Sequence, residues 1–425
     1  MLLTQGLLYI LIHFMGTYDD KNHKIGPMPF GSSNLIHGSP ASLVKIIRSG
    51  EAKSRVDLIR ITGLSRTTIS ERVDSLISVG LLTEEGVTES TGGRRASALS
   101  VPKSSGVVIA VDFGVTHCRW AVARLSGEIL FEEELLVDIS AGAGAVLNWL
   151  IEKVTSQLKK LQLNIDSIIG IGLGVPGPVE FATGRVISPP IMSGWHDVSV
   201  PKILGVPFKN AKIVVDNDVN MMAIGEYVSS WEKETSNLLF VKHSTGIGAG
   251  IVVGRRILHG ELGAAGDLGH VAVDSDETYS CACGNINCVE AVAGGLAIAK
   301  QLRKLGLDVE SARDVAEAAL DGDVRVSSVL REAGRQLGAV LSTVVNLLNP
   351  GAIVISGSIA SAGDALFAGV REVVYSRSTS LATRDLKIVP SSLGARAGVM
   401  GSLYSILEEI FSEASIAELL EKRSA

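Results

Sequence analysis

The chain has 425 residues, enough for two to three domains of about 150 residues each. Hydrophobic residues make up 46% and charged residues 20%, a composition that excludes a disordered chain and permits large buried cores. The formal net charge is −6, which taken alone argues against a nucleic-acid binder, because such proteins usually carry a basic excess. The 46 glycines favour the tight strand-to-loop turns of a nucleotide-binding α/β fold.

Residues 1–38 predict a disordered tail. The first fifteen are apolar but fewer than the about 20 that a transmembrane helix needs. They also lack the basic region and the cleavage site of a signal peptide, so we interpret them as an upstream-start extension. Residues 16–38 are polar and rich in Gly, Ser, Asn and Pro. Since no other apolar stretch is long enough to span a bilayer, we expect a cytoplasmic protein with no membrane partner.

Residues 39–103 predict a winged helix-turn-helix. Three segments with helical spacing are followed by two strand-like runs around a Gly-Gly-Arg-Arg turn. Ser65 and Gly80 are suited to begin and end the third helix, which such a motif places in the major groove of DNA. The alternative is a three-helix packing module that binds no DNA. The expected DNA contacts are short polar or basic side chains: Ser65, Arg66, Thr67, Thr68, Ser70, Arg72, Arg94 and Arg95.

The charge of this segment differs from that of the rest of the chain. Residues 39–103 contain ten Lys or Arg and seven Asp or Glu, a net charge of +3, whereas residues 1–38 cancel and the remainder carries −9. The acidic excess therefore belongs to the body, and the basic head is left to contact DNA. Binding by one head should be modest and salt-sensitive, so a dimer has to reinforce it.

From residue 104 the pattern is α/β and suggests two lobes. We expect a small lobe of residues 104–222 with 398–425, and a large lobe of residues 223–397. Each begins with strands around a glycine-rich turn, which suggests a duplicated unit. Small residues let backbone N–H groups approach a phosphate, so the two turns together suggest a nucleotide cleft of the hexokinase and actin type. The expected phosphate-side residues are Asp112, Gly114 and Thr116 in the first turn and Thr245, Gly246 and Gly248 in the second.

Three of the four cysteines lie within eight residues, which indicates an intracellular metal site instead of a disulfide framework. Cys281, Cys283 and Cys288 follow His270 after ten intervening residues. Three thiolates and one imidazole complete a closed tetrahedral zinc set, so the predicted Zn²⁺ is structural. The alternative is three ordinary buried cysteines. Cys118 is expected in the core.

These motifs together resemble the ROK family of repressors, open reading frames and kinases. The resemblance covers nearly everything from Ser39 to about Leu420. It is carried by the first turn, by Gly-x-Gly-x-Pro-Gly at 172–177, by Asp-Asn-Asp at 216–218, by the second turn, and by Gly-His at 269–270 with the cysteine motif ending at Glu290. An amino-terminal winged helix-turn-helix is similar to the family's sugar-responsive repressors, whereas its kinases generally lack one.

The resemblance implies a sugar site. It assigns sugar contacts to Gly174, Asn217, Asp218, Asp267, His270 and Glu290. In the family's kinases the aspartate that matches Asp218 is the catalytic base that takes the proton of the attacking sugar hydroxyl. His270 would both bind zinc and contact sugar, so the metal would fix its imidazole. The alternative for Asn217 and Asp218 is a helix N-cap after a strand.

Several positions depart from the family pattern. Asp267 stands where the family usually has Glu, Gly194 precedes Trp195 in place of Asn, and Asn287 replaces a glycine. Val115 follows Gly114, and a β-branched residue does not take positive φ cheaply, so the first turn should differ from that of a kinase. The adenosine-side glycine pair is reduced to Gly357 between two serines. Most of the family's sugar-binding residues are thus retained, whereas the motifs that would bind ATP and Mg²⁺ have changed.

The first functional hypothesis is a transcriptional repressor that binds operator DNA and whose effector is a sugar or sugar phosphate. Sugar would close the lobes and shift the spacing of paired heads in a homodimer or homotetramer. The alternative is an ATP-dependent sugar kinase that has gained a DNA-binding head, in which Asp218 would be catalytic.

Overall fold

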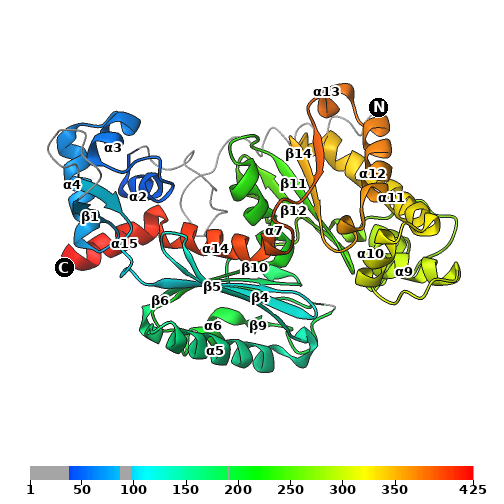
Figure 1. Cartoon of the computed structure of the whole chain (residues 1–425), viewed down its shortest axis with the longest axis horizontal. Helices are drawn as coiled ribbons and strands as arrows, with labels where there is room; N and C mark the ends of the chain where they lie inside the picture. The colour runs from blue at the N-terminus through cyan, green and yellow to red at the C-terminus, as the bar shows by residue number, and fades with distance from the viewer. Residues whose placement is uncertain (1–37, 87–96, 190, 425) are drawn as a thin grey trace.

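The structure is a computed structural model that describes residues 38–86, 97–189 and 191–424. It has three parts, a helical head, a small lobe and a large lobe (Figure 1). The small lobe lies between the head and the large lobe. The C-terminal helices run along the top of the small lobe from the large lobe back to the head.

The head contains three helices and a two-stranded antiparallel sheet, in the order expected from the sequence. Ser39, Ser54 and Ser65 cap the three helices, each accepting a hydrogen bond from a backbone N–H three residues later. The expected stop is also present, since the third helix ends at Ser78 and Gly80 has a φ of 75°. The elements are α2 (Pro40–Arg48), α3 (Arg55–Thr62), α4 (Arg66–Ser78), β1 (Thr83–Gly86) and β2 (Ser97–Ser100).

The small lobe is built on a five-stranded sheet of order β10-β6-β3-β4-β5. Its middle strand alternates between two cores, because successive side chains of a strand point to opposite faces. Val107 and Ile109 pack with the helix that covers the outer face, whereas Val108 and Ala110 pack toward the C-terminal helices. The elements are β3 (Val107–Phe113), β4 (His117–Arg124), β5 (Ile129–Leu136), α5 (Ala143–Lys160), β6 (Ile168–Val175), β7 (Val179–Glu180), β8 (Arg185–Val186), β9 (Val198–Ser199), α6 (Val200–Leu204) and β10 (Lys212–Asn217).

The large lobe contains a second five-stranded sheet, of order β13-β12-β11-β14-β15. Its outer face is covered by helices that form the largest apolar core with it. The longest of these helices ends at Leu348, and its C-cap Asn349, just before Pro350, has a φ of 44°. The elements are β11 (Leu238–His243), β12 (Ile247–Val253), β13 (Arg256–Ile257), α8 (Val289–Ala293), α9 (Gly295–Lys304), α10 (Ala312–Leu320), α11 (Val324–Leu348), β14 (Ala352–Ser356), α12 (Asp364–Arg377), α13 (Ser380–Thr383) and β15 (Lys387–Pro390).

The two sheets have the same topology. In each, the first strand pairs antiparallel with the second and parallel with the fourth, and the fifth strand lies at the far edge. The duplicated unit suggested by the two glycine turns is therefore present as two like lobes.

Two helices fill the space between the sheets, α7 (Asp218–Glu226) and α14 (Ala397–Ile410). They approach closely, because a side chain at Gly401 would lie 1.6 Å from the Met221 carbonyl oxygen. The lobe boundary expected at 222/223 falls inside α7, which continues as a π-helical turn to Trp231. The chain ends in α15 (Glu413–Ser424).

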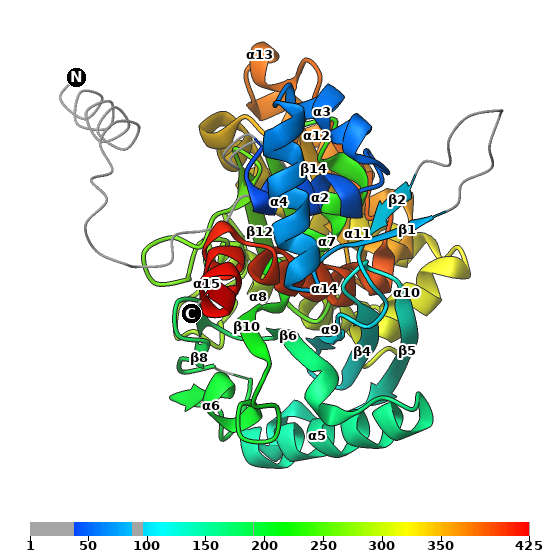
Figure 2. The same cartoon turned by 90° about the vertical axis from the view of Figure 1, so that its left-hand side faces the viewer.

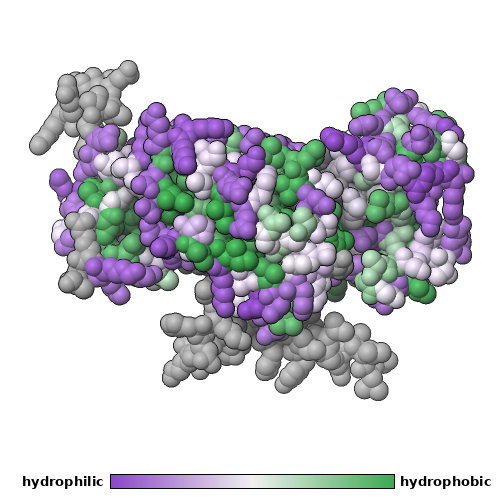
Figure 3. Space-filling model, turned by 90° about the horizontal axis from the view of Figure 1, so that it is seen from below, coloured by the Kyte–Doolittle hydropathy of each residue, from purple (hydrophilic) through white to green (hydrophobic). Residues whose placement is uncertain are grey.

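The head shares a core with the body instead of being joined only by a linker. Apolar residues of α2 and α4 belong to one cluster with residues of β3, α14 and α15. Figure 2 shows α14 and α15 directly beneath the head helices. The described part of the chain has no helix long and apolar enough to cross a membrane. The face seen in Figure 3 mixes hydrophobic and hydrophilic residues.

Candidate functional site

The expected sugar pair lies where β10 ends and α7 begins. Asn217 is the N-cap of α7: its Oδ1 accepts from Val219 N at 2.9 Å, and its Nδ2 donates to the Gly177 carbonyl at 3.1 Å. Asp218 is the first residue of the helix and is buried, with 4% of its side chain exposed. The helix N-terminus favours its negative charge. Asn217 therefore caps the helix, and the carboxylate of Asp218, which is not used for capping, can still bind a ligand.

Asp218 is held by a lysine that the sequence reasoning did not select. Lys242, the fifth residue of β11, places Nζ 2.5 Å from Asp218 Oδ2. Burial lowers the pKa of Lys242, but the neighbouring carboxylates of Asp218 and Asp112 outweigh this effect and raise it overall. The signal was a single charged residue near the end of an otherwise apolar strand, Leu-Leu-Phe-Val-Lys-His, just before the second glycine turn.

Asp112 is a second carboxylate beside Asp218. Both flank Gly174, since a side chain there would lie 3.3 Å from the Asp218 Cα and 3.5 Å from Asp112 Oδ1. Burial, reinforced by the negative charge of Asp218, raises the pKa of Asp112 to about 7. The Asp112 carboxylate also packs on the first turn of α14, because a side chain at Gly398 would lie 2.1 Å from its Oδ2.

The first glycine turn is closed by a histidine. Gly114 donates its N–H to the His117 carbonyl at 2.8 Å, and the His117 ring packs on Gly114, within 2.2 Å of where a side chain would begin. Val115 does not have positive φ, and Thr116 is exposed. The imidazole therefore fills the space beside Gly114.

The second turn, between β11 and β12, is tied to Glu290. Ile247 donates its N–H to Glu290 Oε2 at 2.9 Å, and this oxygen also lies against Gly246. Gly248 packs on α7. Gly357 has a φ of 102° and packs on the backbone of β11, and the serines at 244 and 358 contact each other at 2.9 Å. The structure thus brings Thr245, Gly246, Gly248 and Gly357 to one edge of the large-lobe sheet.

The four expected metal ligands converge. Their ligand atoms all lie within 4.8 Å of one another. Cys283 Sγ lies 3.7 Å from Cys288 Sγ, and Cys281 Sγ lies 3.4 Å from His270 Nδ1. A tetrahedron with Zn–S bonds of 2.3 Å and Zn–N bonds of 2.0–2.1 Å has edges of about 3.8 and 3.6 Å, so the donor set fits zinc. A backbone hydrogen bond from Asn285 lowers the pKa of Cys283 to about 7, which favours the thiolate.

The other nitrogen of His270 faces Asp267. Nε2 lies 3.8 Å from Asp267 Oδ1, and the Asp267 side chain is 63% exposed. Asn287, which stands in place of a glycine, has a φ of 54° and accepts from Tyr279 N at 2.8 Å. Asn tolerates this left-handed conformation better than most residues with a side chain.

Within the head, only some of the expected DNA contacts are exposed. Ser65, Arg66 and Thr67 are exposed at the start of α4. Ser70 and Arg72 instead contact the protein: Ser70 Oγ accepts from Arg55, and Arg72 donates to the Gly38 carbonyl. Thr68 donates its N–H to Ser65 Oγ at 3.1 Å, and Arg94 and Arg95 lie outside the described residues.

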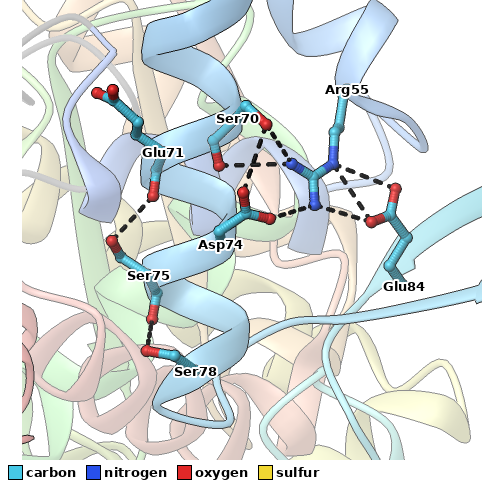
Figure 4. Close-up of polar contacts among 7 residues, drawn as sticks. All are labelled: Arg55, Ser70, Glu71, Asp74, Ser75, Ser78 and Glu84. Atoms are coloured by element: carbon cyan, nitrogen blue, oxygen red, sulfur yellow. Dashed lines mark hydrogen bonds and ion pairs between the residues drawn. The ribbon is translucent and has the colours of Figure 1, made fainter.

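Arg55 is a second residue that the sequence reasoning missed. From the start of α3, its guanidinium contacts Asp74 at 2.6 Å and Glu84 at 2.8 Å, and donates to Ser70 at 2.9 Å (Figure 4). These partners lie on α4 and β1, so one side chain joins three elements of the head. The hydrogen bonds to Glu84 and Asp74 hold the pKa of Arg55 well above its usual range.

Two like lobes around a buried carboxylate, with a histidine–cysteine cluster and a helical head packed on the C-terminal helices, define a kinase-like body carrying an added domain. The chain belongs to the ROK family, whose family model matches residues 108–409. The head lies outside that match.

Curated relatives of two kinds are similar to the chain. The xylose repressor of Caldicellulosiruptor bescii is 29% identical over 87% of this chain and 95% of its own length. The transcriptional dual regulator NagC of Escherichia coli K12 is 26% identical over 93% of this chain and 99% of its own. The glucokinase of Halalkalibacterium halodurans is 30% identical over 71% of this chain and 95% of its own.

Solved structures divide in the same way. A ROK family transcriptional regulator, a homologue of the E. coli MLC protein, superposes with a TM-score of 0.77 at 26% identity and covers 90% of this chain and 98% of its own. The ROK family glucokinase of Streptomyces griseus has a TM-score of 0.60 at 24% identity and covers 70% of this chain and 98% of its own, which shows the shared fold.

Proposed function

We propose that this chain is a transcriptional repressor that responds to a sugar. The observation that carries the proposal is the head: the xylose repressor and the regulator structure match the chain through 87% and 90% of its length, whereas the glucokinases match 71% and 70%. The family match to the body begins at residue 108, after the three helices and β1–β2. A kinase has no need of this head.

The head binds operator DNA as a winged helix-turn-helix. Ser65, Arg66 and Thr67 are exposed at the N-terminal end of α4, where recognition helices contact base edges and phosphates. Arg94 and Arg95 remain predicted wing contacts. We further propose that two or more copies assemble, since paired heads read two half-sites about one helical turn apart.

The body binds the sugar between the lobes. Asn217, Asp218, Glu290 and His270 supply the amide, carboxylate and imidazole groups that pair with sugar hydroxyls, and Gly174 lets its strand approach Asp218 closely. Asp267 is a weaker candidate because it is exposed and turned toward His270. A zinc ion held by His270, Cys281, Cys283 and Cys288 would fix the loop that carries His270, as a structural metal does.

The sugar signal reaches the head through α14. Its first turn packs on the Asp112 carboxylate, beside Asp218. Near its other end, Glu408 forms ion pairs with Lys45 and with Arg48 of α2, the latter at 3.6 Å. A movement of the lobes that shifts this helix therefore shifts the head, and sugar acts by favouring one of two arrangements.

The competing function is an ATP-dependent sugar kinase with an added head. It is favoured by the presence of Asp218 in the position of a catalytic base and by the 30% identity to a glucokinase. The His117 ring against Gly114 and the ion pair of Lys242 with Asp218 argue against it.

The test is a gel shift of the full chain on DNA from upstream of its own gene, with and without a panel of neutral and phosphorylated sugars. A specific shift that one sugar alters supports the proposal, and Arg66→Ala should weaken the shift while sugar binding stays within twofold. Absence of any shift at low salt would overturn it. A coupled assay with ATP and Mg²⁺ tests the kinase: turnover that Asp218→Asn abolishes would establish that activity.

A further inference from the structure

Two carboxylates and one ammonium group lie close together between the lobes, those of Asp112, Asp218 and Lys242. Asp112 and Asp218 flank Gly174, and Lys242 Nζ lies 2.5 Å from Asp218 Oδ2. Asp112 is 8% exposed, whereas a quarter of the Lys242 side chain remains accessible. The three groups come from β3, α7 and β11, so the lysine reaches from the large-lobe sheet to the carboxylates of the other elements.

Paired buried carboxylates need a counter-charge. A hard divalent cation such as Mg²⁺ prefers carboxylate oxygens, and phosphoryl transfer depends on such a cation to neutralise the transferred phosphate. Here the lysine ammonium supplies the positive charge from within the chain. Because the neighbouring carboxylates raise its pKa above the usual lysine value, the ammonium persists across the physiological pH range.

We propose that Lys242 is a built-in counter-cation that takes the place of a divalent metal beside Asp112 and Asp218. The site then binds its ligand without transferring phosphate to it. The statement that the site binds a ligand without phosphorylating it rests on the proposed function. The statement that Lys242 takes the place of a metal ion does not. The proposal explains why Asp218 is present in a protein with a DNA-binding head: its carboxylate is held in an ion pair and serves as a fixed acceptor.

Three features agree with this assignment. Burial and, after it, the negative charge of Asp218 raise the pKa of Asp112 to about 7, and the charge of Lys242 opposes this shift only in part. Arg119, the nearby arginine, is engaged with Glu132 and Glu134, so it does not serve both carboxylates in place of Lys242. The His117 ring packs on Gly114, so an imidazole fills the space beside this glycine of the first turn.

The experiment measures Mn²⁺ binding to the full chain by the loss of the free-ion electron paramagnetic resonance signal at pH 8. The variants are Lys242→Met, which removes the charge and keeps the length, and Lys209→Met, a matched change at an exposed position. Wild type and Lys209→Met should leave the signal unchanged. Lys242→Met should bind one Mn²⁺ at least tenfold more tightly, and adding Asp112→Asn should abolish that gain.

The proposal is overturned if wild type binds Mn²⁺ as tightly as Lys242→Met, or if the Met variant gains no Mn²⁺ binding. Lys242→Gln, which keeps a hydrogen-bond donor near Asp218, carries the same prediction should the Met variant fail to fold. The measurement uses neither DNA nor sugar, so a failed gel shift would contradict the proposed function without contradicting the role of Lys242. Hexose phosphorylation by wild type that depends on Asp218 would also overturn it.

Discussion

His259 Nε2 lies 2.7 Å from Asp216 Oδ2, and this contact joins the large lobe to the small lobe directly beside Asn217 and Asp218. Both side chains are buried, and the ring of Phe181 stacks on that of His259 with centroids 4.0 Å apart. The other oxygen of Asp216 accepts from Asn217 N at 2.7 Å. The interlobe contact and the sugar pair therefore share one carboxylate.

We predict that His259→Phe lowers the free energy of unfolding by about 3 kcal/mol, because it keeps the ring contact but leaves Asp216 Oδ2 without a hydrogen-bond donor in a buried site. Sugar affinity should also fall, since the Asn217 backbone depends on the same carboxylate. Urea denaturation and calorimetric sugar titration measure the two effects. His196→Phe, at an exposed histidine, is the control, and equal losses in both variants would contradict the prediction.

Arg55→Ala should weaken operator binding about tenfold without altering its salt dependence. Arg55 joins α3, α4 and β1, so its loss disturbs the relative position of the recognition helix and the wing strands. Arg66→Ala, at an exposed arginine, should instead reduce the slope of log K against log salt by about 1 for each phosphate that the arginine no longer neutralises. Gel shifts across a salt series distinguish the two, and a reduced slope for Arg55→Ala would mean that Arg55 contacts DNA directly.

Glu408→Gln should uncouple the head from the sugar. The change removes the charge that pairs with Lys45 and Arg48 while leaving the interlobe residues untouched. In wild type, we expect sugar to change the operator affinity by some factor. In Glu408→Gln this factor should be at least threefold closer to one, while the affinity for sugar stays within twofold of wild type. Glu409→Gln is the matched control, because Glu409 pairs with Lys212 of β10, and its ratio should not change.

Cys283→Ser should abolish stoichiometric zinc and weaken sugar binding at least tenfold. The thiolate is one of four ligands, and without the metal the loop that carries His270 loses its anchor. Zinc content by atomic absorption and sugar titration measure the two effects, and chelation of the wild type should reproduce them. Cys118→Ala, outside the cluster, should retain zinc. A full zinc complement in Cys283→Ser would contradict the assignment of this ligand.

Asp112→Asn should become more stable relative to wild type as pH rises from 4 to 8. The folded-state pKa of Asp112 is about 7, above the usual 3.8, so wild type loses stability from this group as pH rises through that window. Over this pH range the unfolding free energy of Asp112→Asn relative to wild type should change by at most about 4 kcal/mol. The groups that face Asp112 are Asp218, Lys242, Arg119 and Glu134.

Chemical denaturation at several pH values measures this effect. The control is Asp138→Asn, since hydrogen bonds from Ser140 lower the pKa of Asp138, and its small effect should have the opposite sign. Parallel pH profiles for wild type and Asp112→Asn would contradict the prediction.

Much of the fold could be predicted because its signals are local. Ser65 and Gly80 bounded the third head helix within a residue or two, and the two glycine turns indicated the duplicated lobes. The metal ligands were found from spacing alone, since Cys281, Cys283 and Cys288 lie in one loop and need only His270 from outside it. Asn217 and Asp218 were found through the family resemblance, and the structure adds that Asn217 also caps α7.

The sequence by itself determined the elements, the metal set and the family, because each depends on residues close together in the chain or on a recognisable motif. Only the tertiary structure decided which distant side chains meet: Lys242 with Asp218, His259 with Asp216, and Glu408 with the head. These contacts depend on how the two sheets pack on α7 and α14, and no local pattern encodes that packing. A lysine within an apolar strand is informative only once the strand has been placed beside two buried carboxylates.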